Sequence, residues 1–230
     1  MELLPTTKIE QNETEMLAPE IQALPTVTSI VLELGGMAMK FAQVDRAPLY
    51  TDTHAENDSE HSFMLALVAN ELATKLYPEE LDAGKVTQYS IVHDLIETIT
   101  GDVATFHFSA EDMELKQQRE HAALEELLNT LPPHTAKLLF QYEQQQEPEA
   151  RFVRAVDKLL PVAVDILGSG EKLMQETYGV TTDEQLLQSH EKLHNRIATS
   201  FKEFPAIVDS HQLLCELFEE EFKVRITPQS

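Results

Sequence analysis

Apolar residues at helical spacing most restrict the folds open to this chain. Between residues 26 and 44 they recur three or four positions apart, which places them on one face of an α-helix. They are Ile30, Val31, Leu34, Met37, Phe41 and Val44. Similar patterns predict helices over about residues 60–77, 85–100, 109–131, 134–145, 148–167, 182–204 and 205–222. No segment alternates apolar and polar residues as a half-buried strand would. The predicted fold class is all-α, a single helical bundle.

Punctuating residues suggest where these helices begin and end. Ser59 and Ser109 are predicted as N-caps, and Gly101 as the residue that stops the third helix. Pro161 is expected to bend the helix over 148–167. The polar residues 1–25 are expected to form an N-terminal arm. Residues 26–230 then form the domain, with a core over about 30–167 and a C-terminal helical extension over about 168–230. The segment 168–183 is its expected flexible or lid-like interruption.

Charge and composition exclude several classes of function. The 230 residues contain 40 Asp and Glu against 17 Lys and Arg, a net charge of -23. That excess repels nucleic acid polymers, but a small phosphorylated metabolite stays compatible with it, because a bound cation and a local arginine reverse the field inside a pocket. No apolar run is long enough for a membrane span, and no secretory signal is visible, so we expect a cytoplasmic protein. Cys215 is the single cysteine, so a metal would need histidines and carboxylates.

The stretch HDLIETITGD, residues 93–102, carries the chemistry. On one helix His93 and Glu97 would point the same way, with Asp94 about 100° round from His93. An imidazole and a carboxylate suit a divalent ion, and Glu97 could deprotonate a water. Two ligands hold a metal weakly, so His61 and Asp157 are added. The apolar neighbours of Asp157 imply burial, which is costly for an unpaired carboxylate. The resulting set suits Mn, Co, Fe, Zn or Mg.

Other residues compete for these roles. Asp165 is a rival of Asp157, but it lies beyond Pro161. The residues HEKLH, 190–194, match the H-E-x-x-H zinc protease pattern, although only scattered glutamates such as Glu203 and Glu216 follow. We favour a fortuitous histidine pair on an exposed or dimer-facing helix. The remaining histidines are expected to be ordinary surface or partly buried residues. They are His54, His107, His121, His134 and His211.

The order EHS, HDLIETITGD, FVRAVDKL resembles the HD-domain superfamily of metal-dependent phosphohydrolases, which are all-helical. The upstream stretch FAQVDRAPLYTDTHAENDSEHS is similar to the subgroup of small 5'-deoxynucleotidases. The resemblance implies one divalent metal ion with ligands at His61, His93, Asp94 and Asp157. It also implies a catalytic Glu97, a phosphate-binding Arg46, and Asp102 as a carboxylate that holds a sugar hydroxyl or assists proton transfer. The substrate would be a (deoxy)nucleoside 5'-monophosphate.

The sequence also departs from that subgroup. Ala47 stands where those enzymes carry a bulky aromatic residue that crowds the sugar, which leaves the sugar preference open. Phe106 and Phe108 follow Asp102 and could stack on a base, although packing is the commoner role of such residues. Arg46 has a structural alternative as an ion pair with one of the many acids. Nucleoside triphosphate hydrolysis, or non-catalytic binding of nucleotide and metal, are the alternative functions, and exposed apolar helix faces are compatible with a homodimer.

Overall fold

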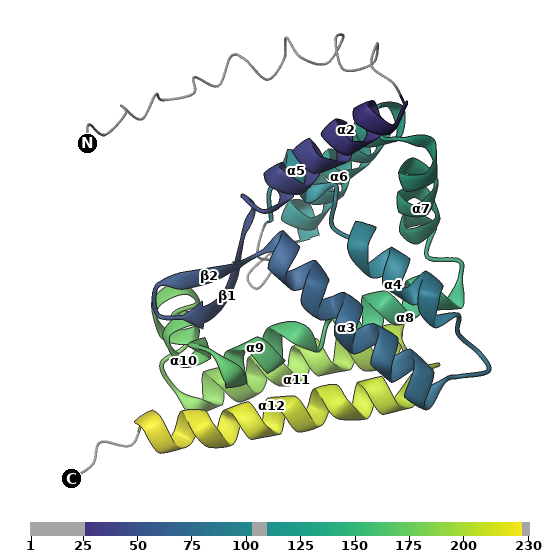
Figure 1. Cartoon of the computed structure of the whole chain (residues 1–230). Helices are drawn as coiled ribbons and strands as arrows, with labels where there is room; N and C mark the ends of the chain where they lie inside the picture. Colours follow the sequence, from purple (N-terminus) through teal and green to yellow (C-terminus); the bar gives the residue numbers. More distant parts are fainter. Residues whose placement is uncertain (1–25, 103–109, 227–230) are drawn as a thin grey trace, which may run out of the picture. The chain divides into compact units, whose positions relative to one another are not determined.

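The computed structural model describes residues 26–102 and 110–226 of the protein (Figure 1). Most of these residues are helical, which confirms the all-α fold class. The helices are α2 (Thr26–Phe41), α3 (Asp58–Leu76), α4 (Ala83–Val92), α5 (Glu97–Thr100), α6 (Ala110–Thr130), α7 (Pro133–Gln144), α8 (Pro148–Asp157), α9 (Leu160–Leu167), α10 (Gly170–Lys172), α11 (Asp183–Ser200) and α12 (Pro205–Ile226), with a π-helical turn, η1 (Leu173–Thr177). The predicted N-terminal arm and the predicted cap Ser109 lie outside the described residues.

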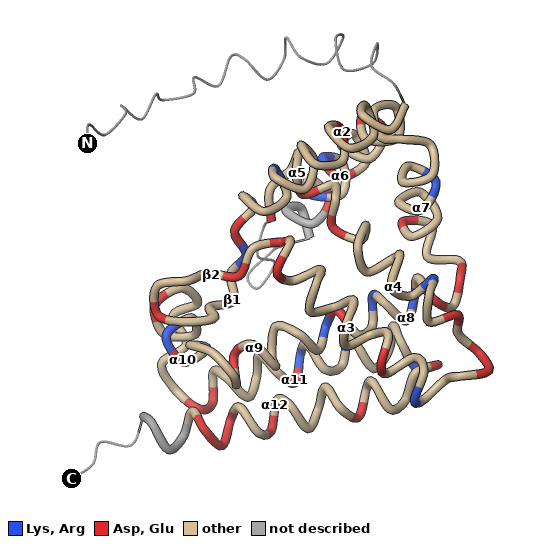
Figure 2. The backbone as a smooth tube through the Cα atoms, in the orientation of Figure 1, with Lys and Arg blue, Asp and Glu red and all other residues tan. Residues whose placement is uncertain are grey.

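The chain divides into two compact units, Met1–Met39 and Lys40–Ser230. Most of α2 belongs to the first unit, and the elements from β1 onward belong to the second. Among the described residues, every helix is too short or too polar to cross a bilayer. Figure 2 shows acidic residues at positions along most of the helices, with fewer basic residues between them.

The stretch RAPLYTDTHAENDSEH, residues 46–61, is polar and rich in turn-forming residues, which predicts a link between two helices, but most of it forms a β-hairpin instead. Strand β1 (Asp45–Thr51) pairs antiparallel with β2 (His54–Asn57). The pairing is irregular, and the one fully buried carboxylate of β2, Glu56, interrupts any apolar alternation. A period of two could therefore not be seen in the sequence. Packing against α9 holds β1 in place, and the Ser169 N–H donates to the Leu49 carbonyl oxygen (2.9 Å).

The predicted long helix over 148–167 is two helices, α8 and α9. The chain leaves α8 after Asp157, and Pro161 lies in the first turn of α9, where a missing N–H costs nothing. The predicted interruption over 168–183 is also packed rather than open. Leu173 and Met174 are buried in it, in a cluster with α12 side chains. A Cβ on Gly168 would collide with the Leu49 carbonyl oxygen, so this position requires glycine.

The second unit has two connected groups of buried side chains. In the first, α3 packs against α4, and α4 packs against α7 and α8, around Leu65, Val86 and Phe152. The second is the apolar cluster of the C-terminal half. It contains Val162, Leu173, Met174, Val180, Leu186, Cys215, Phe218 and Phe222. Ala47 and Leu49 of β1 pack against it. The C-terminal helices therefore support the strand that carries Arg46.

His190 of α11 and His211 of α12 are buried, contrary to the sequence prediction, and His194 is half-buried. His190 is 7% exposed, and its Nδ1 lies 2.7 Å from Glu219 Oε1. His194 stacks on His211 with ring centroids 5.7 Å apart, and His211 is fully buried. Among the described residues, these side chains do not bring three ligand atoms close enough to hold a metal ion. The H-E-x-x-H match is therefore part of the interface between the two helices.

The burial of His211 predicts a pH-dependent stability. Burial and the neighbouring His194 and His190 lower the pKa of His211 from 6.5 to about 4. Below pH 6.5 the unfolded chain takes up a proton at this imidazole, and the folded protein does not. The contribution of His211 to stability is therefore fully present above pH 6.5 and is lost as the pH falls towards 4. We expect this contribution to the free energy of unfolding to fall by about 1 kcal/mol between pH 7.5 and 5.5, and to be absent in His211→Gln.

Urea denaturation of both proteins at the two pH values measures this difference. His134→Gln, at an exposed position, is the control and should behave like the wild type. Parallel losses in the wild type and in His211→Gln would contradict the prediction.

Candidate metal centre

The start of α3 is fixed by a capping box that places His61 in the first turn of the helix. Asn57 Oδ1 accepts hydrogen bonds from the Ser59 and Glu60 N–H groups, and the Asn57 N–H donates to Glu60 Oε2. The N-cap of α3 is therefore Asn57, whereas the sequence had suggested Ser59. Both ends of this box are satisfied, so the helix starts at one defined residue. His61 follows within the first turn and is fully buried.

His93 and Asp94 lie at the end of a helix and not in its middle. The predicted helix over 85–100 breaks, because α4 ends at Val92 and α5 begins at Glu97. Between them the backbone forms tighter three-residue turns, such as Glu97 N–H to the Asp94 carbonyl oxygen (2.8 Å). The predicted i, i+4 relation of His93 and Glu97 on one continuous helix is therefore wrong. Gly101 follows the last residue of α5 and has a φ of 70°, so the helix stops at the glycine that the sequence predicted.

Asp157 is the last residue of α8 and is 6% exposed. Phe152, Val153 and Val156 around it are fully buried, as its sequence neighbours implied. Its carboxylate has two close polar partners, His61 Nε2 at 2.9 Å from Oδ1 and Lys158 Nζ at 2.6 Å from Oδ2. The buried acid is thus compensated on both oxygens.

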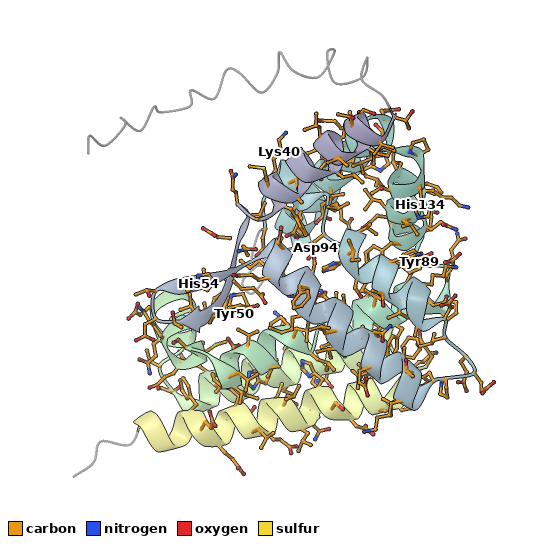
Figure 3. The ribbon with its side chains drawn as sticks, in the orientation of Figure 1. Lys40, Tyr50, His54, Tyr89, Asp94 and His134 are labelled. Atoms are coloured by element: carbon orange, nitrogen blue, oxygen red, sulfur yellow. The ribbon has the colours of Figure 1, made fainter. Side chains whose placement is uncertain are left out.

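The four predicted ligand residues converge at one place. His61, His93, Asp94 and Asp157 each offer a ligand atom, and these atoms all lie within 4.8 Å of one another. Nε2 of His93 lies 2.8 Å from Asp94 Oδ2 and 3.9 Å from Asp157 Oδ1. Figure 3 shows Asp94 among the side chains near the start of α3. Two imidazoles and two carboxylates at this separation suit a first-row divalent ion or Mg²⁺.

The tautomer of His93 fits this role. Its Nδ1 lies 2.9 Å from the Ser90 carbonyl oxygen, which can only accept a hydrogen bond. Nδ1 therefore carries a proton, which leaves Nε2, on the side of the two aspartates, as the nitrogen available to a metal. Nε2 is buried and has no hydrogen-bond partner of good geometry within the described structure. A buried nitrogen that has no hydrogen bond and faces two carboxylates is typical of a metal ligand.

A second group of carboxylates surrounds Arg46. Its Nη1 lies 2.8 Å from Asp94 Oδ2, 3.1 Å from Asp58 Oδ1 and 3.7 Å from Glu97 Oε2. Its Nε lies 3.2 Å from Glu56 Oε2. The guanidinium is 10% exposed, so these contacts are screened little by water. Asp58, Asp94 and Glu97 also offer ligand atoms within 4.8 Å of one another.

Electrostatics separate these acids into two kinds. Burial would raise the pKa of Asp94, but His93 and Arg46 outweigh burial and hold this pKa below its usual range. Burial, Asp94, Asp102 and Asp58 raise the pKa of Glu97 to about 10. Glu97 is therefore the carboxyl of this site that most readily holds a proton. A carboxyl so perturbed inside a charged cluster is a candidate acid or base.

Two residues of this site, Glu56 and Asp58, were not predicted from the sequence. Asp102, which was predicted, lies at the edge of the described residues. Glu56 and Asp58 are fully buried, although they were assigned to a polar link. Asp102 is half-buried, and burial together with Asp94 raises its pKa although Arg46 opposes the shift. Asp165, the rival of Asp157, is buried outside both ligand groups. Phe106 and Phe108 lie outside the described residues.

Comparison with known proteins agrees with this geometry. A family model described as "HD domain" matches residues 39–201. The 5'-deoxynucleotidase HDDC2 of Bos taurus is 34% identical over 109 residues, which cover 45% of this chain and 49% of the relative. The chain therefore spans about half the length of that relative. The 5'-deoxynucleotidase VV1113 of Vibrio vulnificus (strain YJ016) is 27% identical over 172 residues, 69% of this chain and 89% of the relative.

A solved structure is also similar. It is a predicted metal-dependent phosphohydrolase from Magnetospirillum magnetotacticum MS-1, with a TM-score of 0.64 and 27% sequence identity. The match covers 85% of this chain and 96% of that chain. The similarity therefore extends from the proposed ligand residues into the C-terminal helices.

The buried carboxylates around Arg46 predict that loss of this arginine lowers the free energy of unfolding far more than loss of an exposed arginine. Arg46→Gln leaves several buried carboxylates without their cation, so we expect a loss of about 3–5 kcal/mol in the free energy of unfolding at pH 8 in EDTA. Arg151→Gln, which breaks the half-exposed ion pair with Glu203, should cost less than about 1 kcal/mol. Urea denaturation measures both values, and equal small losses would show that Arg46 is not electrostatically required.

Proposed function

The chain belongs to the HD domain family, and from this premise we propose that it is a divalent-metal-dependent phosphohydrolase that cleaves (deoxy)nucleoside 5'-monophosphates to a nucleoside and phosphate. The observation that carries the proposal is the convergence of two imidazoles and two carboxylates beside a buried arginine and a perturbed glutamate. The bovine and Vibrio relatives, both 5'-deoxynucleotidases, support the substrate class, and the similar solved structure supports the reaction class.

We propose that His61, His93, Asp94 and Asp157 hold one divalent ion. Such an ion, when bound, supplies a Lewis acid for the phosphate and lowers the pKa of a water. The ligand residues themselves determine where it sits, since each is at or near a helix end and buried among packed side chains. The donor set leaves the identity of the ion open among Mn, Co, Fe, Zn and Mg.

Glu97 is the proposed proton acceptor. Its pKa of about 10 favours the protonated carboxyl while only carboxylates surround it. Additional positive charge in the ligand set would lower this pKa, because one of its causes is the neighbouring Asp94. Glu97 could then take a proton from the attacking water and orient that water for in-line attack on phosphorus.

Arg46 is the proposed phosphate-binding residue. Among the described residues, both of its side-chain hydrogen bonds come from Nη1, to Asp58 and Asp94. The Nη2 group therefore retains donors for phosphate oxygens. The guanidinium would offset charge that develops on the equatorial oxygens during transfer.

Asp102 is the proposed contact on the sugar side. Asp102 follows Gly101, where α5 ends, and its electrostatic coupling to Arg46 and Asp94 indicates that it faces the same cluster. We propose that its carboxyl holds a sugar hydroxyl or assists proton transfer to the leaving 5'-oxygen. The small side chain of Ala47 packs on the C-terminal apolar cluster. It supplies no bulk to exclude a 2'-hydroxyl, so the proposal includes ribose as well as deoxyribose.

Phosphate release tests the proposal. Chelator-treated protein is assayed against nucleoside mono- and triphosphates with added Mn²⁺, Co²⁺ or Mg²⁺. We expect metal-dependent turnover of monophosphates, and a loss of kcat of about 10²- to 10⁴-fold in Glu97→Gln, because the proton acceptor is removed. Glu125→Gln, at an exposed position on α6, is the control and should retain turnover. Turnover of triphosphates alone, or nucleotide binding without turnover, would replace the proposal by one of its alternatives.

Metal binding tests the ligand set separately. Asp157→Asn weakens a buried ligand, so we expect stoichiometric Mn²⁺ binding to be lost at concentrations that saturate the wild type. Asp165→Asn is a matched control, because Asp165 is also buried and lies in the neighbouring helix α9. Isothermal titration and metal analysis of the dialysed proteins give the stoichiometry. Loss of binding in Asp165→Asn with retention in Asp157→Asn would reverse the assignment.

A further inference from the structure

We infer that Glu56 is a positioning residue that holds a proposed metal ligand, His61, and the proposed phosphate-binding Arg46 on one carboxylate. The inference rests on the proposed function, which supplies the roles of these two partners. The polar partners of the Glu56 carboxylate are Arg46, His61 and Tyr50. It would act through the two side chains that it holds.

The contacts of Glu56 converge on a single side chain. Its Oε2 lies 3.2 Å from Arg46 Nε and 3.3 Å from His61 Nδ1. These are close ion-pair contacts, although their angles fall short of good hydrogen bonds. Its Oε1 accepts a hydrogen bond from the Tyr50 hydroxyl at 3.1 Å. All side-chain atoms of Glu56 are buried, so water does not replace these partners.

The backbone gives Glu56 little freedom to move. It is the residue of β2 directly before Asn57, the cap of α3, and the capping box fixes that junction. The Asp58 N–H donates to the Val44 carbonyl oxygen at 3.0 Å, just before β1. Tyr50, labelled in Figure 3, reaches Glu56 from the partner strand. A carboxylate held from both strands can fix the orientation of what it contacts.

Each partner gains a defined orientation from Glu56. A carboxylate beside Nδ1 of His61 favours the proton on that nitrogen, which leaves Nε2 as the atom for a metal. This Nε2 is the nitrogen that lies 2.9 Å from Asp157 Oδ1. Glu56 contacts Arg46 through Nε, the guanidinium nitrogen nearest the backbone. The two terminal nitrogens of the guanidinium therefore stay available for other partners. One carboxylate thereby connects the metal side and the phosphate side of the site.

A purely structural role would give a different result. If Glu56 only neutralised Arg46 and His61, its loss would lower the free energy of unfolding but leave the metal affinity of the folded protein unchanged. A positioning role predicts weaker metal binding by protein that is still folded. Mn²⁺ affinity therefore distinguishes the two roles, and it does not depend on turnover.

Mn²⁺ titration of the full chain is the experiment. In Glu56→Gln, the neutral amide replaces the carboxylate, and we expect the Kd for Mn²⁺ to rise about 10- to 100-fold. We also expect KM for a nucleoside 5'-monophosphate to rise, since Arg46 loses its anchor. Asp45→Asn removes an exposed carboxylate from the same hairpin and should change the Kd less than about twofold. Tyr50→Phe removes only the hydroxyl that holds Oε1, so an intermediate increase in Kd is expected.

The outcomes separate this inference from the proposed function. An unchanged Kd for Mn²⁺ in folded Glu56→Gln overturns the inference. If Glu56→Gln does not fold, Tyr50→Phe decides, and a Kd equal to that of Asp45→Asn overturns it. A wild type that binds Mn²⁺ but hydrolyses no monophosphate overturns the proposed function alone, while weaker Mn²⁺ binding by Glu56→Gln would still support the connection between Glu56 and His61.

Discussion

The rest of the site depends on the burial of like charges around one guanidinium. Arg46 lies within 3.7 Å of carboxylate oxygens from Glu56, Asp58, Asp94 and Glu97, and it is 10% exposed. Such a cluster is unstable without its cation, because buried carboxylates repel one another and have lost their hydration. The fold meets this constraint by bringing β1, β2, α3 and the α4–α5 junction to the same point. The hairpin that the sequence failed to reveal is thus required electrostatically, since it carries Arg46 and Glu56.

Helix ends supply nearly all the side chains of the site. His61 lies in the first turn of α3, His93 and Asp94 follow the end of α4, and Asp157 ends α8. A helix interior presents a side chain only at fixed angular steps, whereas a residue at a helix end adopts the backbone of a turn and can be aimed independently. Several helices can therefore point ligands at one centre while their apolar faces stay in the core. Because the helix breaks between α4 and α5, His93 and Glu97 do not have the i, i+4 relation that a continuous helix would give them.

The sequence was sufficient for most of the helices and for the convergence of the four proposed ligands, although it joined α4 to α5 and α8 to α9. Asp157 could be identified because its neighbours are apolar, and the structure buries all of them. Glu56 and Asp58 could not, since two acids in a short polar stretch look like a solvated turn until the hairpin closes over them. His211 was missed for a related reason. A single histidine on an amphipathic helix gives no sign of burial, and the contact that buries it comes from His194 on α11.

The carboxylates around Arg46 disfavour a phosphate substrate unless a further cation is bound. The carboxyl groups of Glu56, Asp58, Asp94, Glu97, Asp102 and Asp157 surround or interact with Arg46. Nearby positive charge comes from Lys158, from Lys116 and Arg154, which interact electrostatically with Asp102 and Asp157, and from His61, whose pKa the carboxylates of Asp157 and Glu56 raise to about 9 against the effect of burial. A phosphate dianion that approached this cluster would meet several buried carboxylates, in a protein whose net charge is -23. A divalent ion held by the four converging ligand residues is the direct way to reverse that sign locally. The carboxylates of this chain therefore favour a bound divalent ion, on grounds that do not rest on any relative.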